Sequence, residues 1–159
     1  MKNSQFGFSL IELILVIGIG LTLFGFVGLN LVNGQKIASV NSSEDSLMSD
    51  TSSQQTKAMQ GVGVTSGTNY GIYFLEDRYI LFKGSAYSAS DPANYTVMLE
   101  TGTVFANITF PNSSIVYEGR SGEVIGFTNG SNTLQIKDDQ GSKLKTVTIN
   151  RYGVVSEAN

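Results

Sequence analysis

The one ionisable residue in the first apolar stretch is the side chain whose chemistry most needs an explanation. From Phe8 to Val32 the chain is mostly apolar residues and glycine, and Glu12 alone carries a charge. A helix needs about 20 apolar residues to cross a bilayer, so this stretch predicts a membrane-spanning helix. A carboxylate costs about 2.5–3.5 kcal/mol at mid-bilayer. Glu12 lies near the end of the stretch, where the cost is lower, but its charge still needs a partner.

The residues around Glu12 indicate what that partner is. Gly7 is followed by the segment FSLIE, residues 8–12, and then by the apolar stretch. This order closely resembles the processing site of the type IV pilins and of the pseudopilins of type II secretion. The resemblance implies that a prepilin peptidase cuts between Gly7 and Phe8, that Phe8 becomes N-methylated, and that Glu12 becomes the fifth residue. The new amine of Phe8 can then pair with Glu12 of a neighbouring subunit and set the register of assembly.

Two other interpretations of the N-terminus explain less of it. A secretory signal peptide has a basic start, an apolar core of about 7–15 residues and a small-residue cleavage site. Here Lys2 is the one basic residue before the apolar stretch, the stretch is longer, and no such cleavage site follows. A plain membrane anchor accounts for the length but not for Gly7 and Glu12.

Composition narrows the classes of function. The chain of 159 residues contains no Cys and no His, so disulfides and thiolate or imidazole metal sites are excluded. The commonest catalytic base and the thiol nucleophile are also absent. The net charge is −3, and no basic patch is visible to neutralise phosphates. We therefore expect no enzyme activity, no catalytic residue, no cofactor, no metal and no direct nucleic-acid binding.

Two polar loops remain as candidate sites. The turn of Asp138, Asp139, Gln140 and Gly141 offers oxygens to a calcium ion, but it lacks the spaced ligands of a calcium loop. A solvated hairpin turn is the favoured interpretation. The second loop, residues 118–123, carries three charged side chains and two glycines. It is either a contact for a partner or an ordinary exposed loop with weak ion pairs.

The polar stretch after the apolar one predicts a second helical part. Apolar and small residues recur there at about 3.6-residue spacing, with Gln54 and Gln55 filling a gap. The stripe consists of Ile37, Val40, Leu47, Thr51, Ala58 and Val62. We expect an amphipathic helix that Gly61 and Gly63 end. A flexible stalk over residues 39–53 is the alternative, because serine is abundant there.

The rest of the chain predicts an antiparallel β domain. From Thr68 the apolar period becomes two, and segments 70–75 and 79–82 flank a short turn, which is typical of a hairpin. Asn129-Gly130 is a second hairpin signal. About nine short strands suggest a sandwich. The further predicted strands are residues 95–100, 104–110, 114–117, 124–128, 133–137, 143–150 and 154–155.

The hairpin that follows the long helix resembles the first hairpin of the H-type minor pseudopilins and related minor pilins. The resemblance implies an α+β, pilin-like fold, in which a long N-terminal helix, transmembrane and then amphipathic, packs on an antiparallel β-sandwich-like C-terminal domain. The expected domains are a prepilin leader (1–7), a transmembrane or filament-core helix (8–32), an amphipathic helix extension (33–62) and a globular antiparallel β domain (63–159).

The resemblance also implies a function. The expected protein is a structural subunit, a minor one, of a type IV pilus or type II secretion-like pseudopilus, assembled by helix packing after cleavage and N-methylation. Its expected partners are other pilin or pseudopilin subunits, the prepilin peptidase, the inner-membrane assembly platform and membrane lipid. Before assembly it would lie in the cytoplasmic membrane as a single-pass protein with its C-terminal domain outside. The alternative is a membrane-tethered extracytoplasmic β-domain binding module. Pilus, secretion pseudopilus and DNA-uptake filament all remain open.

Overall fold

The computed structural model describes residues 9–61 and 67–158, although the side chains of residues 26–33 and 157–158 are not described. The chain divides into two compact units, Met1–Gln35 and Lys36–Asn159. The predicted leader lies outside the described residues.

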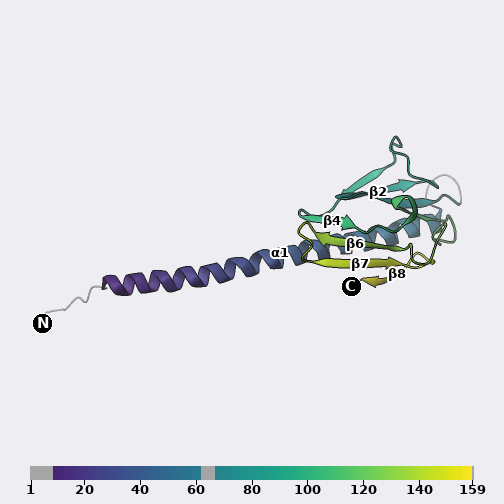
Figure 1. The fold of residues 1–159 in the computed structure, drawn as a ribbon. Coiled ribbons are helices and arrows are strands. Elements are labelled where there is room, and N and C mark those ends of the chain that lie inside the picture. Colours follow the sequence, from purple (N-terminus) through teal and green to yellow (C-terminus); the bar gives the residue numbers. More distant parts are fainter. Residues whose placement is uncertain (1–8, 62–66, 159) are drawn as a thin grey trace. The chain divides into compact units, whose positions relative to one another are not determined.

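A single helix, α1 (Leu10–Gln60), accounts for both predicted helical parts (Figure 1). The stalk interpretation of residues 39–53 is wrong, because these residues are helical throughout. Gly61 ends the helix as predicted, with a φ of 63° that is easy for glycine and with its N–H donating to the carbonyl of Ala58. Gly63 and Val62, which were predicted to take part in this helix end, lie outside the described residues.

The predicted fold class is wrong in its transmembrane helix. Within the described residues, no helix combines the length and the apolar character needed to cross a membrane. The described apolar part of α1, residues 10–25, includes three glycines and a threonine, and falls short of the roughly 20 apolar residues a span requires. From Gly34 onward the helix is mostly polar.

In the described part of the chain, eight strands form two four-stranded antiparallel sheets. The first sheet has the order β3-β2-β1-β5, and the second has the order β4-β6-β7-β8. The predicted first hairpin is confirmed, since Tyr70 of β1 lies opposite Lys83 of β2 and Phe74 lies opposite Tyr79. The strands are β1 (Tyr70–Phe74), β2 (Arg78–Lys83), β3 (Tyr95–Met98), β4 (Thr103–Ala106), β5 (Ser114–Tyr117), β6 (Thr133–Asp138), β7 (Leu144–Ile149) and β8 (Val155–Ala158). A short 3-10 turn, η1 (Pro111–Ser113), precedes β5.

Two of the predicted strand pairings are wrong. The segments 95–100 and 104–110 were expected to flank one turn, but β3 pairs with β2 while β4 pairs with β6 in the other sheet. The predicted strand 124–128 is not formed, and Val124 alone makes an isolated bridge to Tyr117. Asn129-Gly130 therefore turns the chain without joining two paired strands. Alternation of apolar residues marks strands, but it does not identify a partner that lies far away in the sequence.

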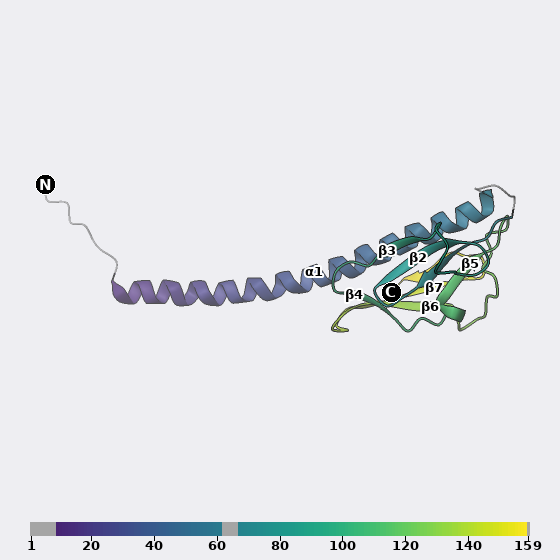
Figure 2. The same ribbon diagram turned by 90° about the horizontal axis from the view of Figure 1, so that it is seen from above.

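Within the second unit, the helical residues from Lys36 onward share one hydrophobic core with both sheets (Figure 2). Most of the predicted helical stripe is buried, including Val40, Leu47 and Ala58, so the prediction of an amphipathic face is confirmed there. Ile37 is an exception and is exposed. Both sheets contribute to the core through Ile72, Phe74, Tyr79, Phe105, Ile115, Tyr117, Leu134, Ile136, Val147 and Ile149.

Candidate functional site

The start of α1 gives Glu12 a partner within its own chain. The Ser9 N–H donates to Glu12 Oε2 at 3.1 Å, and the Ile11 N–H donates to Ser9 Oγ at 3.2 Å. This reciprocal pair is a capping box, which satisfies backbone donors that the first turn of a helix leaves free. The negative charge also lies at the positive end of the helix dipole. Sequence reasoning missed this role, although Ser-x-x-Glu before an apolar run is its recognisable signal.

The other predicted processing residues, Gly7 and Phe8, lie outside the described residues. Cleavage after Gly7 and methylation of Phe8 therefore stay predictions. Among the described residues, Glu12 Oε2 accepts the Ser9 N–H, and Oε1 makes no hydrogen bond. A carboxylate can accept several hydrogen bonds through its two oxygens, so the cap leaves room for a cation from another molecule.

The apolar side chains on both sides of Glu12 in the chain are exposed on every side of the helix. Their exposed fractions range from 52% at Ile17 and Ile19 to 83% at Phe24. A helix that is apolar all round is typical of a buried environment. These side chains therefore form a surface that needs a cover; we call it the apolar helix surface. It consists of Leu10, Ile11, Leu13, Ile14, Leu15, Val16, Ile17, Ile19, Leu21, Leu23 and Phe24.

The glycines of this helical part have no packing role inside the chain. A Cβ added to Gly18, Gly20 or Gly25 would meet nothing within 4 Å. Each glycine costs about 0.8–1 kcal/mol against alanine in a helix interior in water. Small residues do have a use between helices of different molecules, because they let the backbones approach closely.

The later part of α1 meets the β domain through paired polar groups. Glu44 is buried and forms an ion pair with Lys145 of β7. The Tyr79 hydroxyl donates to Asp50 Oδ2 at 2.6 Å, and burial together with this carboxylate raises the pKa of Tyr79. These contacts join the helix to both sheets.

In the turn that was considered for calcium, the carboxylate of Asp138 is already bound by groups of the protein itself. Asp138 accepts the Lys143 N–H at 2.5 Å and the Ser142 hydroxyl at 2.7 Å, and Lys36 lies 3.4 Å away. The backbone N–H of Lys143 is the main reason that the pKa of Asp138 falls to about 2. The predicted hairpin turn between β6 and β7 is confirmed. The described part of the chain holds no group of three or more acidic, Cys or His residues suited to a metal ion.

Two acidic side chains of the second predicted loop, residues 118–123, bind groups of the protein itself. Glu123 lies 3.2 Å from Arg151, and Glu118 accepts a hydrogen bond from the Ser121 hydroxyl at 2.9 Å. Exposed pairs of this kind contribute about 0–1 kcal/mol. The use of this loop by a partner stays a prediction.

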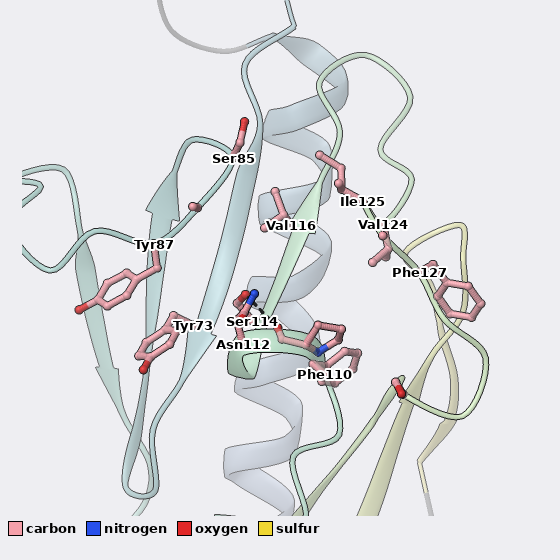
Figure 3. A pocket seen from close by; sticks show the side chains of 14 residues that line it. Tyr73, Ser85, Tyr87, Phe110, Asn112, Ser114, Val116, Val124, Ile125 and Phe127 are labelled. Atoms are coloured by element: carbon pink, nitrogen blue, oxygen red, sulfur yellow. Dashed lines mark hydrogen bonds between the residues drawn. The ribbon is translucent and has the colours of Figure 1, made fainter.

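Sequence reasoning missed a pocket of about 450 Å³ beside β5. In Figure 3 the side chains of Tyr73 and Tyr87 lie on one side and those of Val124, Ile125 and Phe127 on the other, with Val116, Ser114 and Asn112 between them. The sequence had placed Tyr73 in a predicted strand, and Tyr87 lay outside every predicted strand. The pocket depends on three loops that the sequence does not place together.

In comparisons with known proteins, no protein family, curated protein or solved structure matches this chain.

Proposed function

We propose that this protein is a structural subunit, a minor one, of a type IV pilus or type II secretion-like pseudopilus, held together by packing of N-terminal helices. The observation that carries the proposal is the apolar helix surface, exposed on every face and interrupted by one carboxylate, Glu12. Full burial of one Leu, Ile, Val or Phe side chain contributes about 1.5–3 kcal/mol. Helices of neighbouring subunits supply that burial, and the glycines let them come close.

The residues before the helix supply the chemistry of assembly in this proposal. The prepilin peptidase cuts after Gly7, Phe8 is methylated, and its amine meets Glu12 of a neighbouring subunit. Glu12 keeps the Ser9 N–H on one oxygen and offers the other to the amine. The assembly partners are other pilin or pseudopilin subunits and the inner-membrane platform. The proposed location is the cytoplasmic membrane, in contact with lipid, before assembly and the filament afterwards.

The role of Glu12 is tested by separating its charge from its capping bond. Glu12→Gln keeps an acceptor for the Ser9 N–H but removes the charge, whereas Glu12→Ala removes both. We expect both variants to be produced and neither to appear in filaments sheared from the cell surface. Wild-type filament yield with Glu12→Gln would overturn the charge-pairing role and leave Glu12 as a helix cap.

Processing is tested by mass spectrometry of the mature chain. The expected N-terminal peptide begins at Phe8 and is heavier by one methyl group. Gly7→Leu should leave the uncut precursor, while Ser4→Leu, elsewhere in the leader, should be cut normally. A mature protein that still begins at Met1 would contradict the proposal.

A second candidate function is a membrane-tethered extracytoplasmic binding module, which the pocket beside β5 favours. The two functions differ in where the protein is found. A filament subunit is carried in purified filaments, whereas a tethered module remains with the membrane fraction.

A further inference from the structure

The walls of the pocket beside β5 come from four separate segments. Tyr73 belongs to β1, Tyr87 to the loop after β2, Asn112 to η1, and Phe127 to the loop that follows the bridge at Val124. Its volume of about 450 Å³ lies in the range of small-molecule sites, roughly 300–1,000 Å³. None of this depends on the N-terminal helix, so the inference stands apart from the proposed filament function.

One wall is a rigid aromatic platform. The rings of Tyr73 and Tyr87 are stacked, with centroids 4.2 Å apart and planes 7° from parallel. Phe82 supports Tyr87 from behind with an edge contact at 5.9 Å. Neither tyrosine is fully buried, and the described residues offer their hydroxyls no hydrogen bond. The platform is therefore fixed before any ligand arrives, and its polar groups are uncommitted.

The floor of the pocket holds strained backbone. Asn112 and Ser113 are consecutive non-glycine residues in the left-handed region, with φ of 54° and 50°. Asparagine adopts this region more readily than other residues, but two in succession are uncommon. Neither residue is buried, so core packing does not explain the strain. Strain of this kind gathers at ligand sites, and here it holds the Asn112 amide, which has no hydrogen-bond partner among the described residues, at the pocket.

The chemistry of the lining restricts the ligand. It contains no Asp, Glu, Lys or Arg, and its polar groups are hydroxyls and one amide. Phosphates, sulfates and carboxylates are usually bound by charged side chains, which this pocket lacks. Ser85 already accepts from Asn69, and Ser114 donates to the Pro111 carbonyl, so each keeps only part of its hydrogen-bonding capacity. A neutral ligand with apolar faces and several hydroxyl groups fits the aromatic rings together with the tyrosine hydroxyls, the Asn112 amide and this remaining capacity.

The edge of β5 argues against an extended peptide. A peptide that adds to a sheet uses the free backbone groups of an edge strand. Here the Ile125 N–H already donates to the Val116 carbonyl at 2.8 Å, and Val124 is bridged to Tyr117. This part of the edge is occupied by the protein's own chain.

We propose that this pocket binds a neutral carbohydrate, with the flat face of a sugar ring against the tyrosine platform and its hydroxyls bonded to Asn112 and the neighbouring serines. The ligand class is a neutral hexose or N-acetylhexosamine oligomer. The protein would thereby attach to a glycan surface, which is an activity beyond filament assembly.

The test is isothermal titration calorimetry of the full chain in a detergent without a sugar headgroup, because glycoside detergents would compete. The probes are maltotetraose and chitotetraose as neutral sugars, tetragalacturonate as the charged comparison, and a proline-rich decapeptide. We expect saturable binding of at least one neutral sugar and none of the charged one.

Two pairs of variants locate the binding. Tyr87→Ala should weaken it about tenfold by removing one ring of the stacked pair, whereas Tyr152→Ala, an exposed tyrosine outside the lining, should not. Asn112→Gly removes the amide without adding strain, and Asn107→Gly is its control at another position of positive φ. Near-UV circular dichroism of each variant verifies folding. If Tyr87→Ala disturbs the loop, Tyr87→Phe serves as the second variant, because it keeps the aromatic ring and should retain binding.

Three results would overturn the proposal. The first is the absence of binding by every neutral sugar. The second is equal affinity in the pocket variants and their controls. The third is binding of the proline-rich peptide alone, which would make the pocket a peptide site.

Discussion

The two parts of α1 place similar residues in opposite surroundings. Residues 10–25 expose apolar side chains all round and carry one carboxylate, Glu12, at the surface. Residues 36–60 bury a stripe against the sheets and carry a carboxylate, Glu44, that is only 3% exposed. Glu44 is paired with a lysine of its own chain, whereas Glu12 is bound by a single backbone donor among the described residues.

The difference shows which contacts the chain completes by itself. In the later part, polar groups find partners on the sheets, as when Gln54 donates to the Gly71 carbonyl at 2.8 Å. In the earlier part, the apolar side chains remain exposed, and the glycines face open space. A large exposed apolar surface marks a site of interaction with another molecule. The later part is thus a structural element of a domain, while the earlier part presents an apolar surface that the described residues of the chain do not cover.

The largest contrast is expected from the same substitution in each part. Leu47 is 1% exposed, so Leu47→Ala should lower the free energy of unfolding of the β domain by about 2–5 kcal/mol through lost burial and a cavity. Leu21 is 70% exposed, and Leu21→Ala should change that free energy by less than about 0.5 kcal/mol. Urea unfolding of the full chain, followed by near-UV circular dichroism, measures both. Equal losses would mean that residue 21 is covered within the chain.

The ion pair of Glu44 gives the next largest effect. Lys145→Met leaves a buried carboxylate without its cation, which should cost about 2–3 kcal/mol, below the roughly 3–5 kcal/mol of fully buried pairs because Lys145 is one-third exposed. Adding Glu44→Gln should recover most of the loss, because the amide is neutral. Arg151→Met breaks the exposed pair with Glu123 and should cost less than about 1 kcal/mol. Thermal unfolding ranks the stability of the three variants. A smaller loss of stability in Lys145→Met than in Arg151→Met would contradict the expectation that the buried pair contributes more than the exposed one.

The sequence predicted the elements whose partners are local. The hairpin of β1 and β2 and the turn at Asp138 depend on alternation and turn residues that lie next to each other. The buried stripe was recognised from its spacing, but spacing does not say how far a partner extends, so the exposure of Ile37 was missed. The β3–β4 pairing failed for the same reason, because each strand has a partner in a different sheet.

The candidate sites divide in a similar way. Glu12 was identified as the one charge in an apolar stretch. Its hydrogen bond with the Ser9 N–H could have been predicted from the Ser-x-x-Glu spacing, which the sequence interpretation did not use. The pocket beside β5 was not predictable, because Tyr87, Asn112 and Phe127 come from loops without periodic patterns. Only the folded sheets bring such loops together.

A smaller effect is expected from Asp138, which ties Lys36 to the turn before β7. Its pKa of about 2 in the folded protein lies below the ordinary value of 3.8. The Asp138 carboxylate therefore takes up a proton at a higher pH in the unfolded chain than in the folded protein. The stability that Asp138 contributes is therefore complete above about pH 4 and is lost as the pH falls towards 2. Asp138→Asn should flatten this part of the profile of melting temperature against pH, whereas Asp139→Asn should leave it unchanged. An unchanged profile in Asp138→Asn would contradict the assignment.

The smallest effect concerns the cap that holds Glu12. Ser9→Ala removes the hydroxyl acceptor of the Ile11 N–H, and loss of such a cap costs about 0.5–2 kcal/mol. The cost should be confined to the first turn, so amide exchange at Ile11 should speed up about fivefold while unfolding of the β domain is unchanged. Ser52→Ala, at an exposed position within the helix, is the control. Filament yield then separates two roles of Glu12, because a capping role predicts a loss with Ser9→Ala and little loss with Glu12→Gln, which keeps an acceptor for the Ser9 N–H. Pairing with a neighbour's amine predicts that only Glu12→Gln abolishes assembly, since Ser9→Ala keeps the charge in place.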